Sequence, residues 1–244
     1  KHPNCLVMVD ENRKKAIEKI IKNHPEIEVI LLDDAFQHRS VKAGFNILIT
    51  DYNFLYYKNF LLPMGTLRES KESSKRADII VVSKSPKEIN PTEKKGIIQQ
   101  LGVSITQKCY FSQIKYSNWK CITTNKDFLV EEKYSITLVT GIANATPLLE
   151  NLKENGHSVS HLAYADHHNY TINDIEDILN NYRQDNSAKK LILTTEKDAV
   201  KLRKFEKEFG DANIYFAPIE VAFPEKENFE KQILNYVTPN KRNG

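Results

Sequence analysis

The chain has 244 residues, 40% of them hydrophobic, which is enough apolar material for one large globular domain or two modest ones. Its 35 basic and 32 acidic residues leave a formal net charge of +3, so bulk electrostatics predict neither a nucleic-acid partner nor adsorption to an anionic membrane. Three widely spaced cysteines without a C-x-x-C pair argue against a disulfide framework and a structural zinc site, and they favour a reducing cytosolic compartment.

The first part of the chain alternates between strand and helix patterns. Short apolar, β-branched runs predict buried parallel strands at Cys5–Val9, Val29–Leu32, Asn46–Thr50 and Asp78–Ser83. Helical spacing predicts a helix over Glu11–Asn23, with Asp10 as its N-cap, and a weaker one over Pro91–Leu101. This alternation is typical of a doubly wound α/β layer.

From Lys108 to Glu131 the pattern alternates without helical periodicity, which predicts a β connector. A second βα series follows, with strands expected at Ile136–Val139, Ser158–Ala163, Leu191–Thr194 and Ile214–Ala217. Helices are expected at Thr146–Asn155, Ile172–Tyr182 and Phe229–Tyr236. The predicted organisation is a first domain over residues 1–107, a connector over 108–133 and a C-terminal α/β domain over 134–244.

Two carboxylates, Asp33 and Asp34, directly follow the apolar run 29–32. Ligands of open α/β sheets bind at the carboxyl ends of the strands, where a carboxylate can hold a Mg²⁺ ion that bridges nucleotide phosphates. Because successive strand residues face opposite sides, the two aspartates are not expected to share one role. One is expected near the metal and the other to orient it or to face substrate; the alternative is that Asp34 only caps the next turn.

Residues 33–39, D-D-A-F-Q-H-R, resemble the D-D-G-F-Q-H-R signature of the tetraacyldisaccharide 4'-kinases, the lipid A 4'-kinases. Residues 61–69, L-L-P-M-G-T-L-R-E, are similar to that family's L-L-P-A-G-P-L-R-E. Three further matching motifs occur in the family's order, at residues 140–144, 166–170 and 194–201. Five motifs in one order argue against coincidence.

The resemblance implies a fold and an activity. The fold is α/β, with a P-loop NTPase-like parallel sheet, incomplete at its N-terminus, and a second, smaller α/β domain. The activity is ATP- and Mg²⁺-dependent phosphorylation of the 4'-hydroxyl of a tetraacyldisaccharide 1-phosphate, an acylated disaccharide lipid. The location is the cytoplasmic face of the bacterial inner membrane. No run approaches the roughly 20 apolar residues of a membrane span, so membrane contact is expected to be peripheral.

The resemblance also implies roles for residues of the first two motifs. Asp33 and Asp34 are the metal candidates. Arg68 and Glu69 are expected to serve phosphoryl transfer, because an arginine after a Pro-Gly turn is suited to stabilise charge on the moving group; the alternative is a solvated surface ion pair. Gln37 and His38 are expected to line the nucleotide cleft, or else to be hydrogen-bonded core groups.

Outside those motifs, the resemblance implies that His167 assists an aspartate base that deprotonates the sugar hydroxyl. The cluster 166–168 could otherwise be a plain loop or a weak metal site. Arg13 is a candidate contact for the substrate phosphate. Thr195 and Asp198 match a capping box at the start of a helix, a structural role. In the aromatic run 52–60, Phe54, Tyr56 or Tyr57 could meet acyl chains or the membrane interface, or the run could be a packed excursion.

The pattern G-x-x-x-x-G-K-[ST] of a phosphate-binding loop does not occur in the sequence, which starts at Lys1. We therefore expect the chain to lack this loop and the family's catalytic aspartate, and to be inactive by itself. Ala35 replaces the family's glycine, which leaves open whether the backbone there needs positive φ. One rival reading is a non-catalytic lipid- or partner-binding protein derived from the kinase. Another is a metal-dependent hydrolase, which needs Asp33, Asp34, His38 and residues 166–168 to converge.

Overall fold

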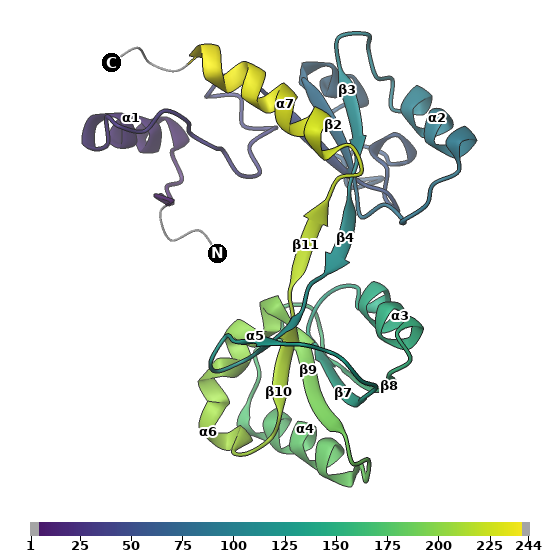
Figure 1. The fold of residues 1–244 in the computed structure, drawn as a ribbon. Coiled ribbons are helices and arrows are strands. Elements are labelled where there is room, and N and C mark those ends of the chain that lie inside the picture. Colours follow the sequence, from purple (N-terminus) through teal and green to yellow (C-terminus); the bar gives the residue numbers. More distant parts are fainter. Residues whose placement is uncertain (1–4, 241–244) are drawn as a thin grey trace. The chain divides into compact units, whose positions relative to one another are not determined.

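The computed structural model describes residues 5–240 and divides the chain into two compact units (Figure 1). The first unit comprises Lys1–Ile114 and Val221–Gly244, and the second comprises Lys115–Glu220. These limits differ from the predicted domains at the C-terminus, since the last helix, α7 (Lys226–Val237), belongs to the first unit. Each unit is described separately below.

The first unit is built on a three-stranded parallel sheet of order β1-β2-β3. Its strands are β1 (Ile47–Asp51), β2 (Ile79–Ser83) and β3 (Lys108–Phe111). Alternate residues of the central strand serve opposite faces, as the two-residue period of a strand requires. Ile80 and Val82 pack in a core with Ile97 of α2 (Pro91–Gln100), which covers one face.

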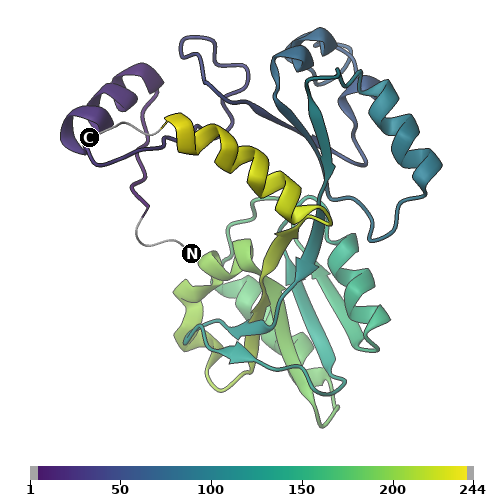
Figure 2. The ribbon, with the colours of Figure 1, turned by 45° about the horizontal axis from the view of Figure 1, so that its top comes forward.

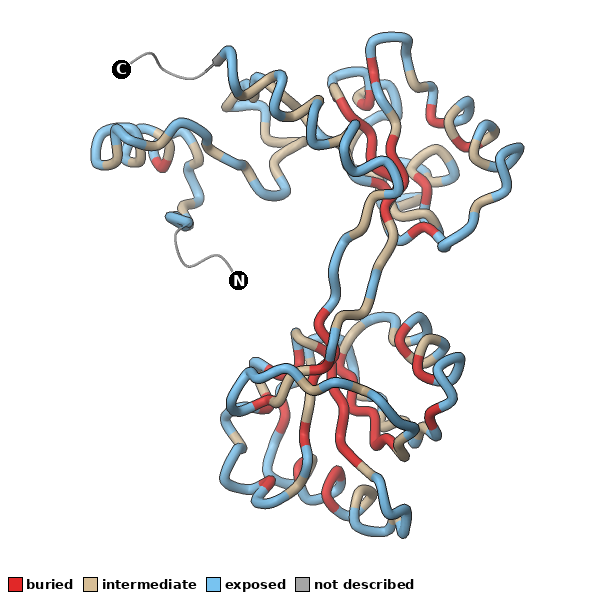
Figure 3. The backbone as a smooth tube through the Cα atoms, viewed as in Figure 1, coloured by how far each residue is buried: buried red, intermediate tan, exposed pale blue. Residues whose placement is uncertain are grey.

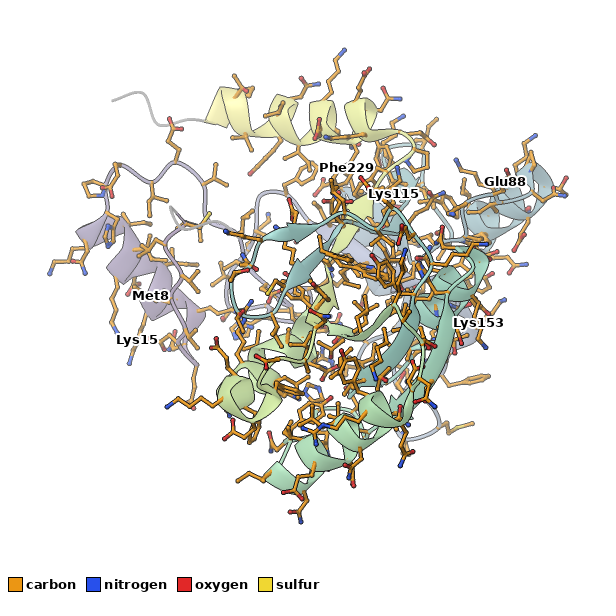
Figure 4. All side chains as sticks on the ribbon, turned by 60° about the horizontal axis from the view of Figure 1, so that its bottom comes forward. Met8, Lys15, Glu88, Lys115, Lys153 and Phe229 are labelled. Carbon is orange, nitrogen blue, oxygen red and sulfur yellow. The ribbon has the colours of Figure 1, made fainter. Side chains whose placement is uncertain are left out.

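The other face of this sheet is covered by α7. Ile79 and Val81 pack there against Phe229 and Ile233. The Phe229 ring, labelled in Figure 4, lies 5.3 Å from the Tyr110 ring in an edge-on arrangement. Cover on both faces explains why the β2 sequence reads as a continuous apolar run.

Two of the predicted strands, Cys5–Val9 and Val29–Leu32, are wrong. Both segments have irregular backbone, and Val9 and Leu31 are 94% and 90% exposed. The exposed and intermediate colours dominate this part of the chain in Figure 3. An apolar run forms a strand only where a neighbouring strand takes up its backbone hydrogen bonds, and no described strand pairs with either segment.

The helix expected at Glu11–Asn23 is α1 (Arg13–Asn23), and its predicted cap is also wrong. The N-cap is Asn12, whose side chain accepts a hydrogen bond from the Lys15 N–H at 3.1 Å. Asp10 lies two residues before the N-cap and instead accepts from the Asn12 N–H at 2.8 Å.

The second unit contains a six-stranded sheet of order β6-β5-β10-β9-β7-β8. The last four are parallel: β7 (Ser135–Thr140), β8 (Ser158–Ala163), β9 (Lys190–Thr195) and β10 (Ile214–Ala217). The first two, β5 (Trp119–Cys121) and β6 (Asp127–Phe128), are antiparallel additions. The predicted strands of this βα series are confirmed to within one residue at each end.

Helices cover both faces of the second sheet (Figures 1 and 2). On one face, α3 (Thr146–Glu154) contributes Leu148 and Leu152 to a core with Ile136 and Leu138. On the other, α4 (Ile172–Gln184), α5 (Glu196–Leu202) and α6 (Glu206–Phe209) share a core with Val139 and Ile192. The carboxyl ends of β7, β8 and β9 therefore lie at the edge of a sheet that is packed on both faces.

The predicted connector is rich in β-structure, but its strands serve three different sheets. β3 belongs to the first sheet, and β5 and β6 belong to the second. Only β4 (Gln113–Tyr116) pairs elsewhere, with β11 (Ile219–Ala222), where the chain returns toward the first unit. Within residues 5–240, every helix is too short or too polar to cross a bilayer.

Candidate functional site

The aspartates of the motif 33–39 lie in a tight turn and not at the end of a strand, because the preceding apolar run is irregular. Asp34 has a φ of 43°, in the left-handed region that Asp tolerates better than most residues. The residue that needs this conformation is thus Asp34 and not Ala35. Alanine in place of the family's glycine is compatible with the observed backbone.

Arg68 joins the two motifs of the first unit. Its Nη2 donates to Gln37 Oε1 at 3.1 Å and lies 3.7 Å from Asp34 Oδ1. The Arg68 and Asp34 side chains are 58% and 80% exposed, so their attraction contributes at most about 1 kcal/mol to stability. The arrangement keeps a guanidinium and a carboxylate open to solvent, where a ligand can reach both.

Glu69 is held far more firmly than its neighbour. Its carboxylate accepts from Arg76 at 2.7 Å and from Arg39 at 3.1 Å, and its side chain is only 16% exposed. Burial acts to raise the Glu69 pKa, but hydrogen bonds from Ser73 and Arg39 and the charge of Arg76 outweigh it and lower that pKa. Arg76 also donates to Phe36 O at 3.3 Å. Glu69 and Arg76 therefore clamp the two motifs together.

Two other predicted residues lie beside this cluster. His38 Nδ1 is 2.9 Å from Ser40 Oγ, a local contact within its own loop. Arg13 Nη2 donates to Asp33 O at 3.4 Å, which places the start of α1 next to the first aspartate. Asp34, Gln37 and Arg68 thus contact one another through Arg68. Arg13 joins them only by its hydrogen bond to the backbone of Asp33.

The donors present suit Mg²⁺. The cation takes oxygen ligands and is usually bound by one or two carboxylates together with phosphate oxygens. Asp33 and Asp34 are both exposed, and the Asp34 carboxylate lies beside Arg68. Among the described residues, no group of three His, Cys, Asp or Glu side chains is placed to hold a metal ion. The metal-dependent hydrolase reading requires such a group and receives no support.

In the second unit, the remaining three motifs meet at the carboxyl edge of β7, β8 and β9. Asp198 is fully buried, and its Oδ2 accepts from the Gly141 N–H at 2.9 Å and from Thr195 Oγ1 at 2.7 Å. Thr195 is the N-cap of α5, as predicted, because its side chain accepts from the Asp198 N–H. The Asp198 carboxylate therefore also accepts a hydrogen bond from Gly141, the residue that directly follows β7.

His167 lies on the loop that follows β8. Its N–H donates to Gly141 O at 3.1 Å, its φ is 62°, and its side chain is 74% exposed. Lys197 Nζ lies 3.1 Å from Asp166 Oδ1 and 3.4 Å from His167 Nε2. The hydrogen bond from Lys197 is the main cause of a lowered Asp166 pKa. The imidazole therefore projects from an anchored backbone with a carboxylate and an ammonium beside it.

His168 points the other way and is built into the unit. Its Nε2 lies 3.1 Å from Asp174 Oδ2, its carbonyl accepts from Lys201 at 2.8 Å, and its ring stacks 4.7 Å from Tyr164. Of the two adjacent histidines, His167 is the one presented to solvent. Asp174 sits in a capping box with Thr171, and the spacing Thr171-x-x-Asp174 before an apolar run is the sequence signal that could have indicated it.

Arg76 and Lys197 are also absent from the predicted site residues, although each is in ionic contact with one of the motifs. Arg76 comes just before β2, and Lys197 lies inside the motif 194–201. A charged residue within or next to a matched motif is the signal that could have indicated both. Their partners, however, depend on tertiary contacts.

Comparison with known proteins agrees with this motif pattern. The sequence profile described as tetraacyldisaccharide-1-P 4'-kinase matches residues 1–238. The chain is 38% identical over 256 residues to the tetraacyldisaccharide 4'-kinase of Bacteroides fragilis (strain YCH46), covering 100% of this chain and 68% of that protein. It is 38% identical over 249 residues to that of Flavobacterium psychrophilum, with 100% and 69% covered.

A solved structure shares the fold. The crystal structure described as the "apo" form of LpxK from Aquifex aeolicus in complex with ATP matches with a TM-score of 0.64 and 23% sequence identity. The match covers 93% of this chain and 63% of that chain, so this chain spans less than two thirds of the solved protein. With the profile and close relatives covering nearly every residue, the chain belongs to the tetraacyldisaccharide 4'-kinase family.

Proposed function

We propose that this protein acts in ATP-dependent transfer of a phosphoryl group to the 4'-hydroxyl of a tetraacyldisaccharide 1-phosphate. The observation that carries the proposal is the contact of Arg68 with Gln37 and Asp34, which brings two family motifs into one exposed cluster. Membership in a kinase family supports the reaction class. An anionic phosphate chain fits the open guanidinium of this cluster.

Within the cluster, each side chain has a distinct task. Arg68 has five N–H donors in a planar fork, so it can keep its bond to Gln37 and still donate to oxygens of the transferring group. Asp33 or Asp34 would hold Mg²⁺, which neutralises charge on the phosphates when bound. Glu69 keeps the Arg68 segment in place through Arg39 and Arg76.

His167 is proposed to support the base that takes the proton from the sugar hydroxyl. Its ring is 74% exposed and its backbone is anchored, so the imidazole can exchange its contact with Lys197 for a hydrogen bond that orients a carboxylate. This role comes from the resemblance of residues 166–170 to the family motif. Asp166 and Lys197 are the charged groups beside it.

The lipid part of the substrate has a candidate contact in the first unit. A hollow of about 410 Å³ is lined mainly by Phe60, Leu61, Leu62, Pro63, Met64 and Leu67, the residues that lead up to Arg68. The hollow is open to solvent, since Phe60, Leu62 and Met64 are 60%, 61% and 83% exposed, so it offers an apolar surface and not an enclosed cavity. We propose that an acyl chain of the substrate enters here while the protein lies against the cytoplasmic face of the inner membrane.

In the aromatic run 52–60, some side chains pack inside the first unit and others are exposed to solvent. Tyr56 is tied down by a hydrogen bond of 2.6 Å to Leu101 O, whereas Phe54 is 79% exposed. We therefore expect Phe54→Ser to weaken binding to anionic phospholipid vesicles and Tyr56→Phe to leave it unchanged. Equal vesicle binding by both variants and the parent would remove Phe54 from the lipid contact.

The activity test needs a phosphate-binding loop, because the 244 residues contain no G-x-x-x-x-G-K-[ST] pattern. We predict that the purified chain transfers no phosphate from labelled ATP to tetraacyldisaccharide 1-phosphate. A loop-bearing chimera, which adds the part of the Bacteroides fragilis relative that this chain does not cover and where we expect the loop, should restore transfer. If a folded chimera stays inactive but still binds the lipid, the non-catalytic binding protein is the better description.

A further inference from the structure

Two buried polar atoms in the second unit have no hydrogen-bond partner among the described residues: Asp198 Oδ1 and the Tyr170 hydroxyl. Asp198 is 0% exposed and Tyr170 is 7% exposed. Leaving a buried polar group without a hydrogen bond is costly, so native proteins rarely keep one without a reason. Two such atoms in one motif cluster call for a common explanation.

Both atoms face the same point beside Gly141. A Cβ built on this glycine would lie 3.0 Å from Asp198 Oδ1 and 3.2 Å from the Tyr170 hydroxyl oxygen. Their chemistry is complementary, because a carboxylate oxygen accepts and a phenol O–H donates. Burial, followed by the charge of Asp198, raises the pKa of Tyr170, which keeps the phenol protonated and able to donate.

The second carboxylate oxygen of Asp198, Oδ2, is connected to His167 by two hydrogen bonds through Gly141. Oδ2 accepts from the Gly141 N–H at 2.9 Å, and Gly141 O accepts from the His167 N–H at 3.1 Å. Gly141 therefore links the buried carboxylate to the exposed histidine on its two sides. Tyr170, three residues after His167, brings the same loop back to Asp198.

We propose that Tyr170 and Asp198 form a buried hydrogen-bonded pair, directly or across one water, that positions the loop 166–170 and thereby His167. Both are positioning residues, since neither is exposed to a reactant. The backbone of His167 is in the left-handed region, at a φ of 62°, which is unfavourable for a residue other than glycine. Anchors at Gly141 and at Asp198 hold the loop in this conformation.

The functional part of this proposal rests on the proposed role of His167, whereas the positioning part does not. The first experiment therefore uses the 244-residue chain and the hydrogen-exchange rate of the His167 amide, observed by NMR. Tyr170→Phe removes only the hydroxyl, and Asp198→Asn keeps the shape of the side chain. Each is expected to speed exchange of the His167 amide about tenfold, the loss of roughly one buried hydrogen bond.

Tyr164→Phe is the matched control. The Tyr164 ring lies 4.7 Å from the His168 ring and 5.2 Å from the Tyr170 ring, so the variant removes a neighbouring hydroxyl outside the pair. Exchange at His167 should stay at the parent rate. An unchanged rate in Tyr170→Phe would overturn the proposal, and this mild variant keeps the test valid if Asp198→Asn does not fold.

The second experiment measures kinetics in the loop-bearing chimera. Tyr170→Phe should lower kcat about tenfold and leave the KM for ATP unchanged, because it displaces His167 without touching the nucleotide cluster. If exchange accelerates while His167→Ala has normal kcat, the positioning pair stands and the proposed role of His167 fails. If His167→Ala loses activity while Tyr170→Phe changes neither exchange nor kcat, the positioning pair fails alone.

Discussion

Arg68 Nη2 donates to Gln37 Oε1 at 3.1 Å, across thirty-one positions of the chain. The bond favours one orientation of the guanidinium, and among the described residues no other side-chain hydrogen bond from Arg68 is seen. A guanidinium oriented in advance stabilises developing negative charge without reorganising during the reaction. The function of Arg68 should therefore depend on its forked geometry as well as on its charge.

The first prediction concerns this geometry. In the loop-bearing chimera, Arg68→Lys keeps the positive charge but loses the planar fork that can contact Gln37 and a phosphate together. We expect kcat to fall about 100-fold, the usual cost of removing one transition-state donor, with little change in KM for the lipid. Steady-state kinetics with varied ATP and lipid measure both constants.

Arg183→Lys on α4 is the control for the same chemical change at an exposed position. It should keep the parent kcat. A normal kcat for Arg68→Lys would show that charge alone suffices and would count against the proposed role of the fork.

The second prediction concerns Glu69. Because its folded pKa is lowered, ionised Glu69 stabilises the fold above its unfolded pKa of about 4.5, and this stability is lost as pH falls through the lowered value. We expect Glu69→Gln to reduce the free energy of unfolding by about 1 kcal/mol at pH 7. At pH 3 the difference from the parent should shrink.

Urea denaturation followed by circular dichroism measures these differences. Glu88→Gln, at an exposed position labelled in Figure 4, is the control and should behave as the parent at both pH values. An effect of Glu69→Gln that is equal at pH 7 and pH 3 would contradict the ionic clamp.

The third prediction concerns Asp174 in the second unit. Burial acts to raise its pKa, but hydrogen bonds from Thr171 and His168 outweigh burial and lower it, so its stabilising effect is present above about pH 4 and lost on acidification below that. Asp174→Asn should cost about 1 kcal/mol at pH 7, the usual value of a helix cap. The cost should diminish toward pH 3.

Trp119 offers a probe for that measurement. It is the single tryptophan of the sequence and is 5% exposed in the core of the second unit, so its emission reports unfolding of this unit. Asp177→Asn, on the exposed side of α4, is the control. Matching urea midpoints for Asp174→Asn and the parent at pH 7 would contradict the capping role.

Sequence patterns predicted the second unit well because its strands are locally marked. Each apolar run there is bounded by polar turns, and the helices that cover it have periodic apolar faces, as in Ile175 and Ile178 of α4. The run Val29–Leu32 looks similar but has no partner strand among the described residues. An apolar run does not encode which strand pairs with it.

The same limit applies to α7 and to the sites. Helical spacing predicted α7, but its packing on β2 depends on Phe229 meeting Val81, 148 positions earlier by residue number. The family motifs predicted Gln37 and Arg68 as site residues. The hydrogen bond from Arg76 to Glu69 depends on tertiary structure and was not predicted. The sequence pattern predicted Asp198 as part of a capping box. Its hydrogen bond from the Gly141 N–H depends on the tertiary structure and could not be predicted.

The last prediction tests that link through the space around Gly141. A methyl group there would lie 3.0 Å from Asp198 Oδ1, 3.2 Å from the Tyr170 oxygen and 3.3 Å from His168 Cβ. The first two atoms are buried and cannot move aside freely. We therefore expect Gly141→Ala to destabilise the second unit by about 1–3 kcal/mol, the usual cost of overpacking, measured by urea denaturation with Trp119 emission.

Gly96→Ala is the matched control, because nothing lies within 4 Å of a Cβ at this position in α2. A helical glycine-to-alanine change in open space should stabilise by about 0.5–1 kcal/mol, observed by circular dichroism. The same substitution thus has opposite expected signs at the two sites. If Gly141→Ala proved neutral, Asp198 and Tyr170 would have room to separate, and the close arrangement that links the buried carboxylate to the His167 loop would be refuted.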